Sequence, residues 1–293
     1  MTNRNQIPTL GVMQTVSFIC VNFNNSQYTE KFCESLSAQS GRGEVFLVRC
    51  LVVDNSTDET DSARLKAICR KYEWIQYISS DRNLGYFGGL SRGLAQRPQE
   101  HSRFVVLCNN DLEFDPSFCR ELLALAKDPR AFAICPDVVT LDGKHQNPHL
   151  LERVRVFRRF QFDLFFSHFY VACVLSFIRR LFLRLSVATL PSIQERREIH
   201  MGIGACYVLT ENYFSHFDNL DCPVFLYGEE VFMSAQIHSK GGVLIYEPRL
   251  RVNHAGRAAL SRIPRRVAYE YERKSYPQYR NLLFGNVERG NRD

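Results

Sequence analysis

Short apolar runs alternate with helix-like stretches through the first half of this 293-residue chain, and few folds accommodate that order. The strand-like runs lie at 16–21, 48–54, 74–79, 104–108 and 131–139. They are apolar along their length, which is typical of parallel strands buried on both faces. Strand–helix repeats of this kind predict an α/β fold with a mostly parallel central sheet and helices on both of its faces.

Polar clusters follow the expected strands where these end. They are Asn22–Ser26, Asp54–Asp58, Asn83–Gly89 and Asn109–Asp111. In open parallel sheets, ligands bind beyond the carboxyl ends of the strands. We therefore expect the four clusters to lie along one edge of the sheet and to form a ligand site.

The second half has further expected strands at 202–209, 243–248 and 249–254, and it differs in its charge pattern. The whole chain has a formal net charge of +6, but the segment 151–190 alone contains seven arginines and two acids. Residues 191–248 are acidic and 249–293 are basic, so two basic blocks flank an acidic one. Such blocks indicate surfaces that meet anions. The share of hydrophobic residues, 45%, excludes a disordered, collagen-like or coiled-coil chain.

The cysteines and the apolar segments bear on the cellular compartment. None of the ten cysteines forms a C-x-x-C pair, which argues against a zinc knuckle or a thioredoxin-type site. Many lie in apolar runs, as buried thiols do in a reducing compartment. No secretory signal is evident, and the longest uncharged run, 164–178, is shorter than the ~20 residues of a membrane-spanning helix. We expect a cytoplasmic protein.

Two acidic residues follow apolar strands. Asp54 could accept a hydrogen bond from a pyrimidine N–H of a ligand, or it or Ser56 could simply cap the next helix. Asp58 is expected to be a helix cap in either case. Asp111 ends an oxygen-rich segment that suits Mg²⁺ or Mn²⁺ together with diphosphate oxygens, and a plain turn is the alternative.

Three further residues stand at the ends of elements in the second half. Glu229 and Glu230 begin an expected helix, where the helix dipole alone favours acidic residues. A general base would need one of them to project into the ligand cleft. His254 ends an expected strand and is a metal ligand only if it converges on Asp111, since a lone histidine is usually structural.

A glycine-rich turn, NLGYFGGLSRGL, follows the third expected strand. Its glycines include Gly85, Gly88 and Gly89, and glycine allows a backbone to approach a ligand closely. The spacing is neither the G-x-G-x-x-G of dinucleotide-binding folds nor a phosphate-binding P-loop, so a Rossmann dehydrogenase is disfavoured.

In their order and spacing these segments resemble family 2 glycosyltransferases of the GT-A fold, especially the rhamnosyltransferase-like members that build bacterial surface polysaccharides. The resemblance covers about residues 15–260 and rests on VNFNN, VVDNSTD, NLGYFGGLSRG, LCNND, GIGACYVL, FLYGEEVFMSAQIHSKGG and VNHAG. It implies a nucleotide-sugar-binding half at 1–150, a basic amphipathic helical insertion at 151–190, an acceptor-binding half with the catalytic base at 191–262, and a basic C-terminal tail at 263–293.

The resemblance also implies a role for each site residue. Those that would bind the nucleotide sugar are Asn22, Asn24, Asp54, Asn83, Gly85, Gly88, Gly89 and Asn110. Asp111 and His254 would hold Mg²⁺ or Mn²⁺. Glu230 would be the catalytic base, with Glu229 as the second candidate, because the family usually has Asp at the position of Glu230.

The activity that the resemblance implies is an inverting, metal-dependent sugar transfer. The donor would be dTDP-rhamnose first and a UDP-sugar second, and the acceptor a lipid-linked oligosaccharide or polysaccharide in cell-surface glycan synthesis. Two alternatives stay open. One is a sugar-phosphate nucleotidyltransferase, although the G-x-G-x-R-type loop after the first strand is missing. The other is a catalytically silent, membrane-associated scaffold of glycan synthesis.

The segment 151–190 interleaves arginines with Phe, Leu and Val. As helices it would fit an interfacial element with its apolar face in an anionic membrane, placing the protein on the inner face of the cell membrane. The alternative is that it packs on the catalytic domain or on a second subunit of a homo-oligomer. Nucleic acid is a disfavoured partner, because the basic blocks match no known nucleic-acid-binding motif.

Overall fold

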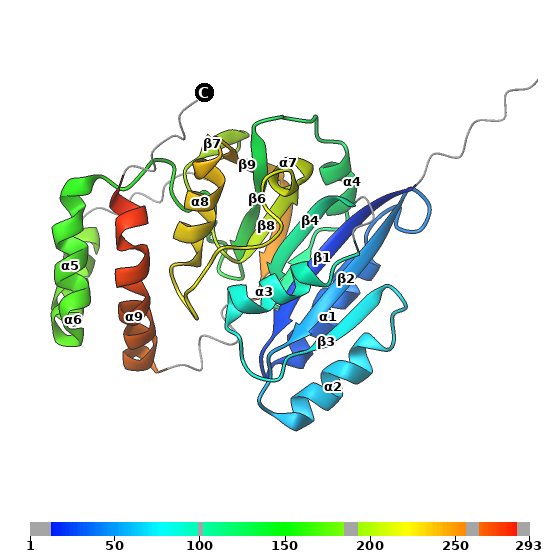
Figure 1. The fold of residues 1–293 in the computed structure, drawn as a ribbon, viewed down its shortest axis with the longest axis horizontal. Helices are drawn as coiled ribbons and strands as arrows, with labels where there is room; N and C mark the ends of the chain where they lie inside the picture. Colours follow the sequence, from blue (N-terminus) through cyan, green and yellow to red (C-terminus); the bar gives the residue numbers. More distant parts are fainter. Residues whose placement is uncertain (1–12, 99–101, 185–192, 256–263, 286–293) are drawn as a thin grey trace, which may run out of the picture.

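The computed structural model of the chain describes residues 13–98, 102–184, 193–255 and 264–285. Within these residues a nine-stranded sheet forms the centre, with helices around it (Figure 1). The strands are β1 (Gln14–Asn22), β2 (Phe46–Asp54), β3 (Ile75–Ser79), β4 (Ser102–Asn109), β5 (Leu112–Phe114), β6 (Ala131–Thr140), β7 (Arg197–Ile199), β8 (Cys206–Thr210) and β9 (Val243–His254).

The strand order is β3-β2-β1-β4-β8-β6-β9-β5, with β7 also paired to β9. β1 is parallel to β2 and β4, and β2 is parallel to β3. Because β8 is antiparallel to both β4 and β6, β6 runs in the direction of β4, and β9 is parallel to β6. Six of the nine described strands, β1, β2, β3, β4, β6 and β9, thus run the same way, which confirms the predicted α/β fold with a mostly parallel sheet.

Helices cover both faces of this sheet. On one face lie α1 (Ser26–Ser37), α2 (Glu59–Cys69) and α4 (Phe118–Leu123), and on the other α3 (Tyr86–Ala95), α7 (Glu211–Phe214) and α8 (Glu229–Ser239). Successive side chains of a strand point to opposite faces. In β1, Phe18 accordingly packs in the core with Phe32 of α1, whereas Ile19 packs in the core with Leu90 of α3. This two-sided burial explains why the strands are apolar along their length.

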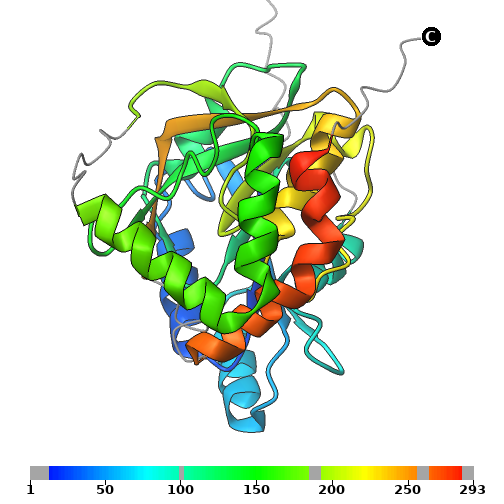
Figure 2. The same ribbon diagram turned by 90° about the vertical axis from the view of Figure 1, so that its left-hand side faces the viewer.

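Three further helices form a layer beside the sheet, and Figure 2 shows them across one face of the molecule. They are α5 (Arg159–Ser167), which follows the short 3₁₀ helix η1 (Val156–Arg158), α6 (Phe169–Arg184) and α9 (Arg265–Phe284). Phe166 of α5 stacks on Tyr276 of α9, with ring centroids 4.4 Å apart. Asp163 of α5 accepts a hydrogen bond of 2.6 Å from the Tyr276 hydroxyl and forms an ion pair with Arg280 of α9. These contacts hold α9 against α5.

Some element boundaries differ from those expected. The strands expected at 243–248 and 249–254 form one strand, β9, whose pairing with β6 shifts register after Pro136. The strand expected at 202–209 begins only at Cys206, because the preceding residues form a turn in which the Tyr207 hydroxyl donates a 2.7 Å hydrogen bond to the Gly202 carbonyl. The segment expected as a basic tail, 263–293, contains the packed helix α9.

All ten cysteines belong to the described residues and are free thiols. Cys173 and Cys222 are partly exposed, and the other eight are buried. Burial raises the pKa of Cys69 to about 12, so the thiol stays protonated. The buried cysteines therefore act as small apolar side chains of the core.

None of the helices in the described part of the chain is both long enough and apolar enough to span a lipid bilayer.

Candidate active site

The carboxyl ends of the parallel strands bring the expected site residues to one edge of the sheet. Asn22 and Asp54 are the last residues of β1 and β2 and lie side by side in the register of the pair. Asn109 ends β4 and pairs beside Val21. His254 ends β9 and lies opposite Leu112, the residue after Asp111. The predicted convergence of these polar clusters is therefore what the fold produces.

Asn22 lies fully buried where β1 and β2 end at this edge, and it organises the loops around it. Its side-chain nitrogen donates hydrogen bonds of 2.8 Å to Ser56 Oγ and 2.9 Å to Asp61 Oδ2, and lies 3.5 Å from Asp54 Oδ1. Its side-chain oxygen accepts a bond of 3.0 Å from the Thr29 hydroxyl. Asn22 thus acts within the protein, where it positions the loop around Asp54.

The Asp54 carboxylate is held in its ionised form. It accepts hydrogen bonds from the Ser56 amide at 3.0 Å and from the Tyr77 hydroxyl at 2.9 Å. Burial opposes ionisation, but the hydrogen bonds from Ser56, Ser62 and Tyr77 outweigh it and lower the pKa of Asp54 below its usual value. The cap of α2 is Asp58, which accepts a 2.9 Å bond from the Thr60 amide, as expected. Asp54 is therefore not needed as the cap.

Two other asparagines fix the loop after β1. Asn24 has a positive φ of 52°, and its side-chain oxygen accepts bonds of 3.0 Å from the amides of Thr57 and Asp58. Asn110 is buried, and its amide nitrogen donates to Thr29 Oγ1 at 2.7 Å and to Asn25 Oδ1 at 2.8 Å. These amides connect the loops after β1, β2 and β4 into one rigid unit.

The glycine-rich turn packs tightly against the protein itself. The Asn83 side chain accepts a 2.9 Å bond from the Gly85 amide, and Gly85 has a positive φ of 75°. A Cβ at Gly85 would overlap the carbonyl oxygen of Phe225. A Cβ at Gly89 would lie 2.8 Å from the Val21 side chain, so this glycine lets α3 approach β1.

Gly88 differs from these two glycines. A Cβ there would meet only Leu84, at 3.1 Å, in the same turn. Of the three glycines predicted to border a ligand, Gly88 is therefore the one that the packing of the protein does not itself require.

Asp111 and His254 form a buried pair, with Asp111 Oδ1 and His254 Nε2 3.2 Å apart. The other ring nitrogen, Nδ1, lies 2.6 Å from Gln146 Oε1. An amide oxygen at that distance accepts the Nδ1 proton and fixes the ring so that Nε2 faces Asp111. The Asp111 carbonyl also accepts a 3.0 Å bond from the Ala255 amide, which holds the two segments together.

This pair fits a divalent cation in its chemistry. A carboxylate oxygen and an imidazole nitrogen suit Mn²⁺, and Mg²⁺ or Mn²⁺ commonly takes one or two protein ligands together with substrate phosphates. No group of three or more His, Cys, Asp or Glu side chains that could hold a metal occurs among the described residues. A cation here would thus depend on donor phosphates for the rest of its coordination shell.

The paired glutamates at the start of α8 have different environments. Glu230 Oε1 accepts a 3.1 Å hydrogen bond from the Gly204 amide. Glu229 Oε2 is buried and has no hydrogen-bond partner. Burial, together with the negative charge of Glu230, raises the pKa of Glu229 to about 8. At neutral pH Glu229 is therefore mostly protonated, which leaves Glu230 as the better candidate for a base.

Tyr86, at the start of α3, is linked to the glutamates through Gly204. Its hydroxyl donates a 3.0 Å bond to the carbonyl of Gly204, the residue whose amide binds Glu230. Burial first, and then nearby cysteines and the charges of Glu229 and Asp111, raise the pKa of Tyr86 well above its usual value. Tyr86 thus lies beside the glutamates and belongs to the candidate site.

Sequence reasoning did not identify Tyr86, Tyr77, Asp61 or Gln146. Tyr86 lies within the quoted glycine-rich segment, so its tyrosine type could have indicated it. Asp61 looks like an ordinary acid in the first turn of a helix. Tyr77 and Gln146 have no local signal, because their partners, Asp54 and His254, are distant in sequence.

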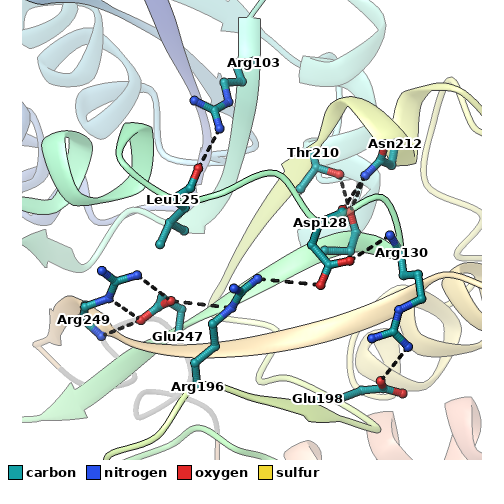
Figure 3. Close-up of polar contacts among 11 residues, drawn as sticks. Arg103, Leu125, Asp128, Arg130, Arg196, Glu198, Thr210, Asn212, Glu247 and Arg249 are labelled. Carbon is teal, nitrogen blue, oxygen red and sulfur yellow. Dashed lines mark hydrogen bonds and ion pairs between the residues drawn. The ribbon is translucent and has the colours of Figure 1, made fainter.

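A second polar cluster lies at the amino-end edge of β4 and β6, away from these residues (Figure 3). Buried Glu247 receives two bonds from Arg249, of 3.0 and 3.1 Å, and Arg196 lies 3.8 Å from both Glu247 and Asp128. The charges compensate one another. This cluster therefore secures loops at the amino end of the sheet.

Comparison with known proteins identifies the family and the fold. The family described as Glycosyl transferase family 2 matches residues 17–187, more than half of the chain. No significant match was found among curated protein sequences.

Solved structures with a similar fold include three proteins that bind a nucleotide or a nucleotide sugar. GalNAc-T7 with UDP, GalNAc and Mn²⁺ has 15% identity and a TM-score of 0.56, over 83% of this chain and 44% of that one. Mannosyltransferase PcManGT from Pyrobaculum calidifontis, in complex with GDP-Man and Mn²⁺, has 13% identity and a TM-score of 0.54, over 94% of this chain and 65% of that one. S. aureus TarS 1–349 with UDP-GlcNAc has 11% identity and a TM-score of 0.53, over 86% of this chain and 62% of that one. The chain thus spans less than two thirds of each of these relatives, and the likeness shows the fold.

Proposed function

The chain belongs to glycosyl transferase family 2, and from that premise we propose that it transfers a sugar from a nucleotide-sugar donor to an acceptor hydroxyl with inversion. One observation supports this most. A single edge of the sheet carries an ionised carboxylate at Asp54, the buried Asp111–His254 pair, and Glu230 held by the Gly204 amide. Transfer from a nucleotide sugar uses three such groups: one binds the nucleobase, one holds the cation that offsets the diphosphate charge, and one accepts the proton of the acceptor hydroxyl.

The donor would be a pyrimidine nucleotide sugar. An ionised Asp54 can accept the N–H of a uracil or thymine ring, and its hydrogen bonds keep it ionised over the physiological pH range. The rigid loops fixed by Asn24 and Asn110 would shape the nucleotide pocket. dTDP-rhamnose is our first donor and a UDP-sugar the second. The solved relatives hold UDP, UDP-GlcNAc or GDP-Man, which supports a nucleotide donor without selecting its sugar.

Mg²⁺ or Mn²⁺ would be held by Asp111 and His254, which have suitable donor atoms 3.2 Å apart. Such a cation offsets the negative charge that develops on the departing diphosphate. Gln146 orients the imidazole for this task.

Glu230 would take the proton of the attacking hydroxyl. The Gly204 amide fixes its carboxylate, and the neighbouring Glu229 stays protonated at neutral pH and so cannot compete for that proton. One base and one direct displacement at the anomeric carbon give inversion. The acceptor would be a lipid-linked or polysaccharide hydroxyl in cell-surface glycan synthesis, on the inner face of the membrane.

The test combines a donor screen with a substitution. Purified protein is melted with a panel of nucleotide sugars, with and without Mn²⁺, and the donor that raises the Tm is then used in turnover assays. Glu230→Gln should lower turnover by about 10²- to 10⁴-fold and leave the donor-induced rise in Tm intact. The matched control is Glu211→Gln, because Glu211 is an exposed glutamate on α7, away from the candidate site.

Near-normal turnover of Glu230→Gln would remove Glu230 from the base role. Donor binding without any transfer or donor hydrolysis in the wild type would instead favour the catalytically silent scaffold. Release of pyrophosphate from a sugar phosphate and a nucleoside triphosphate would favour the nucleotidyltransferase.

A further inference from the structure

The described part of the helical layer exposes two apolar stripes to solvent. On η1 and α5, Phe157, Phe160 and Leu164 are exposed, and their spacing of three and four residues places them on one side of the helix. On α6, the exposed residues Tyr170, Val174 and Phe177 follow the same helical spacing, with Ile178 beside them. Phe160 is 73% exposed and Phe177 is 68% exposed.

The opposite sides of the same helices make the internal contacts. Phe166 and Ala172 are buried in the core shared with α9. The Phe165 carbonyl accepts a 2.9 Å bond from the Tyr269 hydroxyl, and the Phe166 carbonyl accepts a 3.0 Å bond from Arg273. The core of the domain therefore already uses the inner sides, and the two exposed stripes are surplus to it.

Positive charge borders these stripes. Three arginines are exposed: Arg155 in the segment before η1, Arg158 on η1 and Arg179 on α6. Of the two acids between 151 and 184, Asp163 points inward and is neutralised by Arg280. The other, Glu152, is exposed at the start of the segment. The outer side thus presents large apolar side chains with an excess of arginine around them.

We propose that this outer side of η1, α5 and α6 docks in the interface of an anionic lipid bilayer. Apolar side chains flanked by arginines match a surface whose interior is acyl chain and whose rim is phosphate. α5 and α6 lie along the membrane and do not cross it, since no described helix is long and apolar enough to span.

The docking surface is connected to the candidate base by α9. Ser275 of α9 donates a 2.7 Å bond to the Leu226 carbonyl, and Tyr279 fills the space that a Cβ on Gly228 would need. These contacts fall on the loop that leads into Glu229 and Glu230. One helix, α9, therefore separates the docking surface from the loop that leads into the candidate base. This inference rests on the proposed function in that it explains how a lipid-linked acceptor would reach Glu230.

Vesicle co-sedimentation of the full chain tests the proposal. Vesicles of phosphatidylcholine alone are compared with vesicles that also contain phosphatidylglycerol, at low and high salt. We expect binding to the anionic vesicles that weakens with salt. The double variant Phe160→Ser, Phe177→Ser should bind at least about tenfold more weakly, since two large aromatic side chains would no longer be buried.

A matched pair of valines controls for exposure. Val174 on α6 is 57% exposed, and Val45, in the turn before β2, is 65% exposed. Val174→Asp should weaken vesicle binding, and Val45→Asp should leave it unchanged. Thermal unfolding of each variant checks that the fold is kept. Donor hydrolysis without vesicles should be the same in the wild type and in all of these variants. Its absence from all of them, the wild type included, would count against the proposed function and not against the docking surface.

Three results would overturn the proposal. One is no binding to anionic vesicles by the wild type. Another is equal binding by the wild type and the double variant. The third is a dimer in sedimentation velocity that Phe160→Ser, Phe177→Ser dissociates while vesicle binding is absent, which would assign the surface to a second copy of the chain.

Discussion

The substitution Glu229→Gln tests whether Glu229 is protonated in the folded protein while its neighbour Glu230 carries a negative charge. Burial, reinforced by the charge of Glu230, raises the pKa of Glu229 from an ordinary 4.5 to about 8. The unfolded chain loses this proton near its ordinary pKa, whereas the folded protein keeps it until about pH 8. Between these limits the folded state binds about one more proton, so its stability falls by about 1.4 kcal/mol for each unit of rising pH.

The size of the effect follows from this difference in proton binding. Below the ordinary pKa both states are protonated and Glu229 contributes no penalty. From pH 5 to pH 7 the folded state loses about 2 to 3 kcal/mol, and above pH 8 the loss is constant. Glutamine has the shape of the protonated acid but cannot ionise. Glu229→Gln should therefore be more stable than the wild type by about 1 kcal/mol near pH 5 and by about 3 kcal/mol at pH 7.

Urea unfolding followed by circular dichroism at several pH values between 5 and 8 measures this difference. Glu230→Gln is the informative control, because removing the neighbouring charge lowers the pKa of Glu229 and should flatten the same pH dependence only in part. Parallel stability curves for the wild type and Glu229→Gln would refute the assignment of a protonated Glu229, and with it the reason for preferring Glu230 as the base.

Three further predictions concern the donor side of the site. Tyr77→Phe removes a hydrogen bond from Asp54 and should lower the free energy of unfolding by about 1 kcal/mol. The stabilisation from Asp54 is present above its ordinary pKa and is lost on acidification, so the variant should show a smaller acid-side loss in urea unfolding; an unchanged acid limb would contradict this. His254→Ala should abolish the extra rise in Tm that Mn²⁺ gives in the presence of donor, and a retained rise would place the cation elsewhere. Gly85→Ala forces a methyl group against a facing carbonyl at a φ of +75° and should lower the Tm, whereas Gly43→Ala, at a φ of +83° with open space, should show the smaller cost of backbone strain alone.

The strand ends were the most predictable part of the molecule. Asn22, Asp54 and His254 are the terminal residues of β1, β2 and β9, and Glu229 begins α8. An apolar run that stops at a polar residue marks both the end of a strand and the position of the sheet edge, so the fold and the place of the candidate site could be predicted together.

Other parts had no local pattern to predict them. β5 and β7 have three residues each, too few for a periodicity. α9 is rich in charged residues and tyrosine, and its buried side becomes apparent only where Phe166 and Asp163 of α5 meet it. Gln146 acts on a histidine 108 positions later, and such a contact depends on the folded topology and not on the neighbouring sequence.

The ten thiols give the molecule an internal reporter of its own motions. Cys173 lies on α6 and Cys222 on the segment that leads to α8, and these two are partly exposed, whereas residues such as Cys20 and Cys108 lie deep in the core. A disulfide reagent would therefore label Cys173 and Cys222 first, at rates that report on the helical layer and on the segment before α8, and would label the core thiols only on global unfolding. Mass spectrometry of one labelling time course would separate these three rates without introducing any probe.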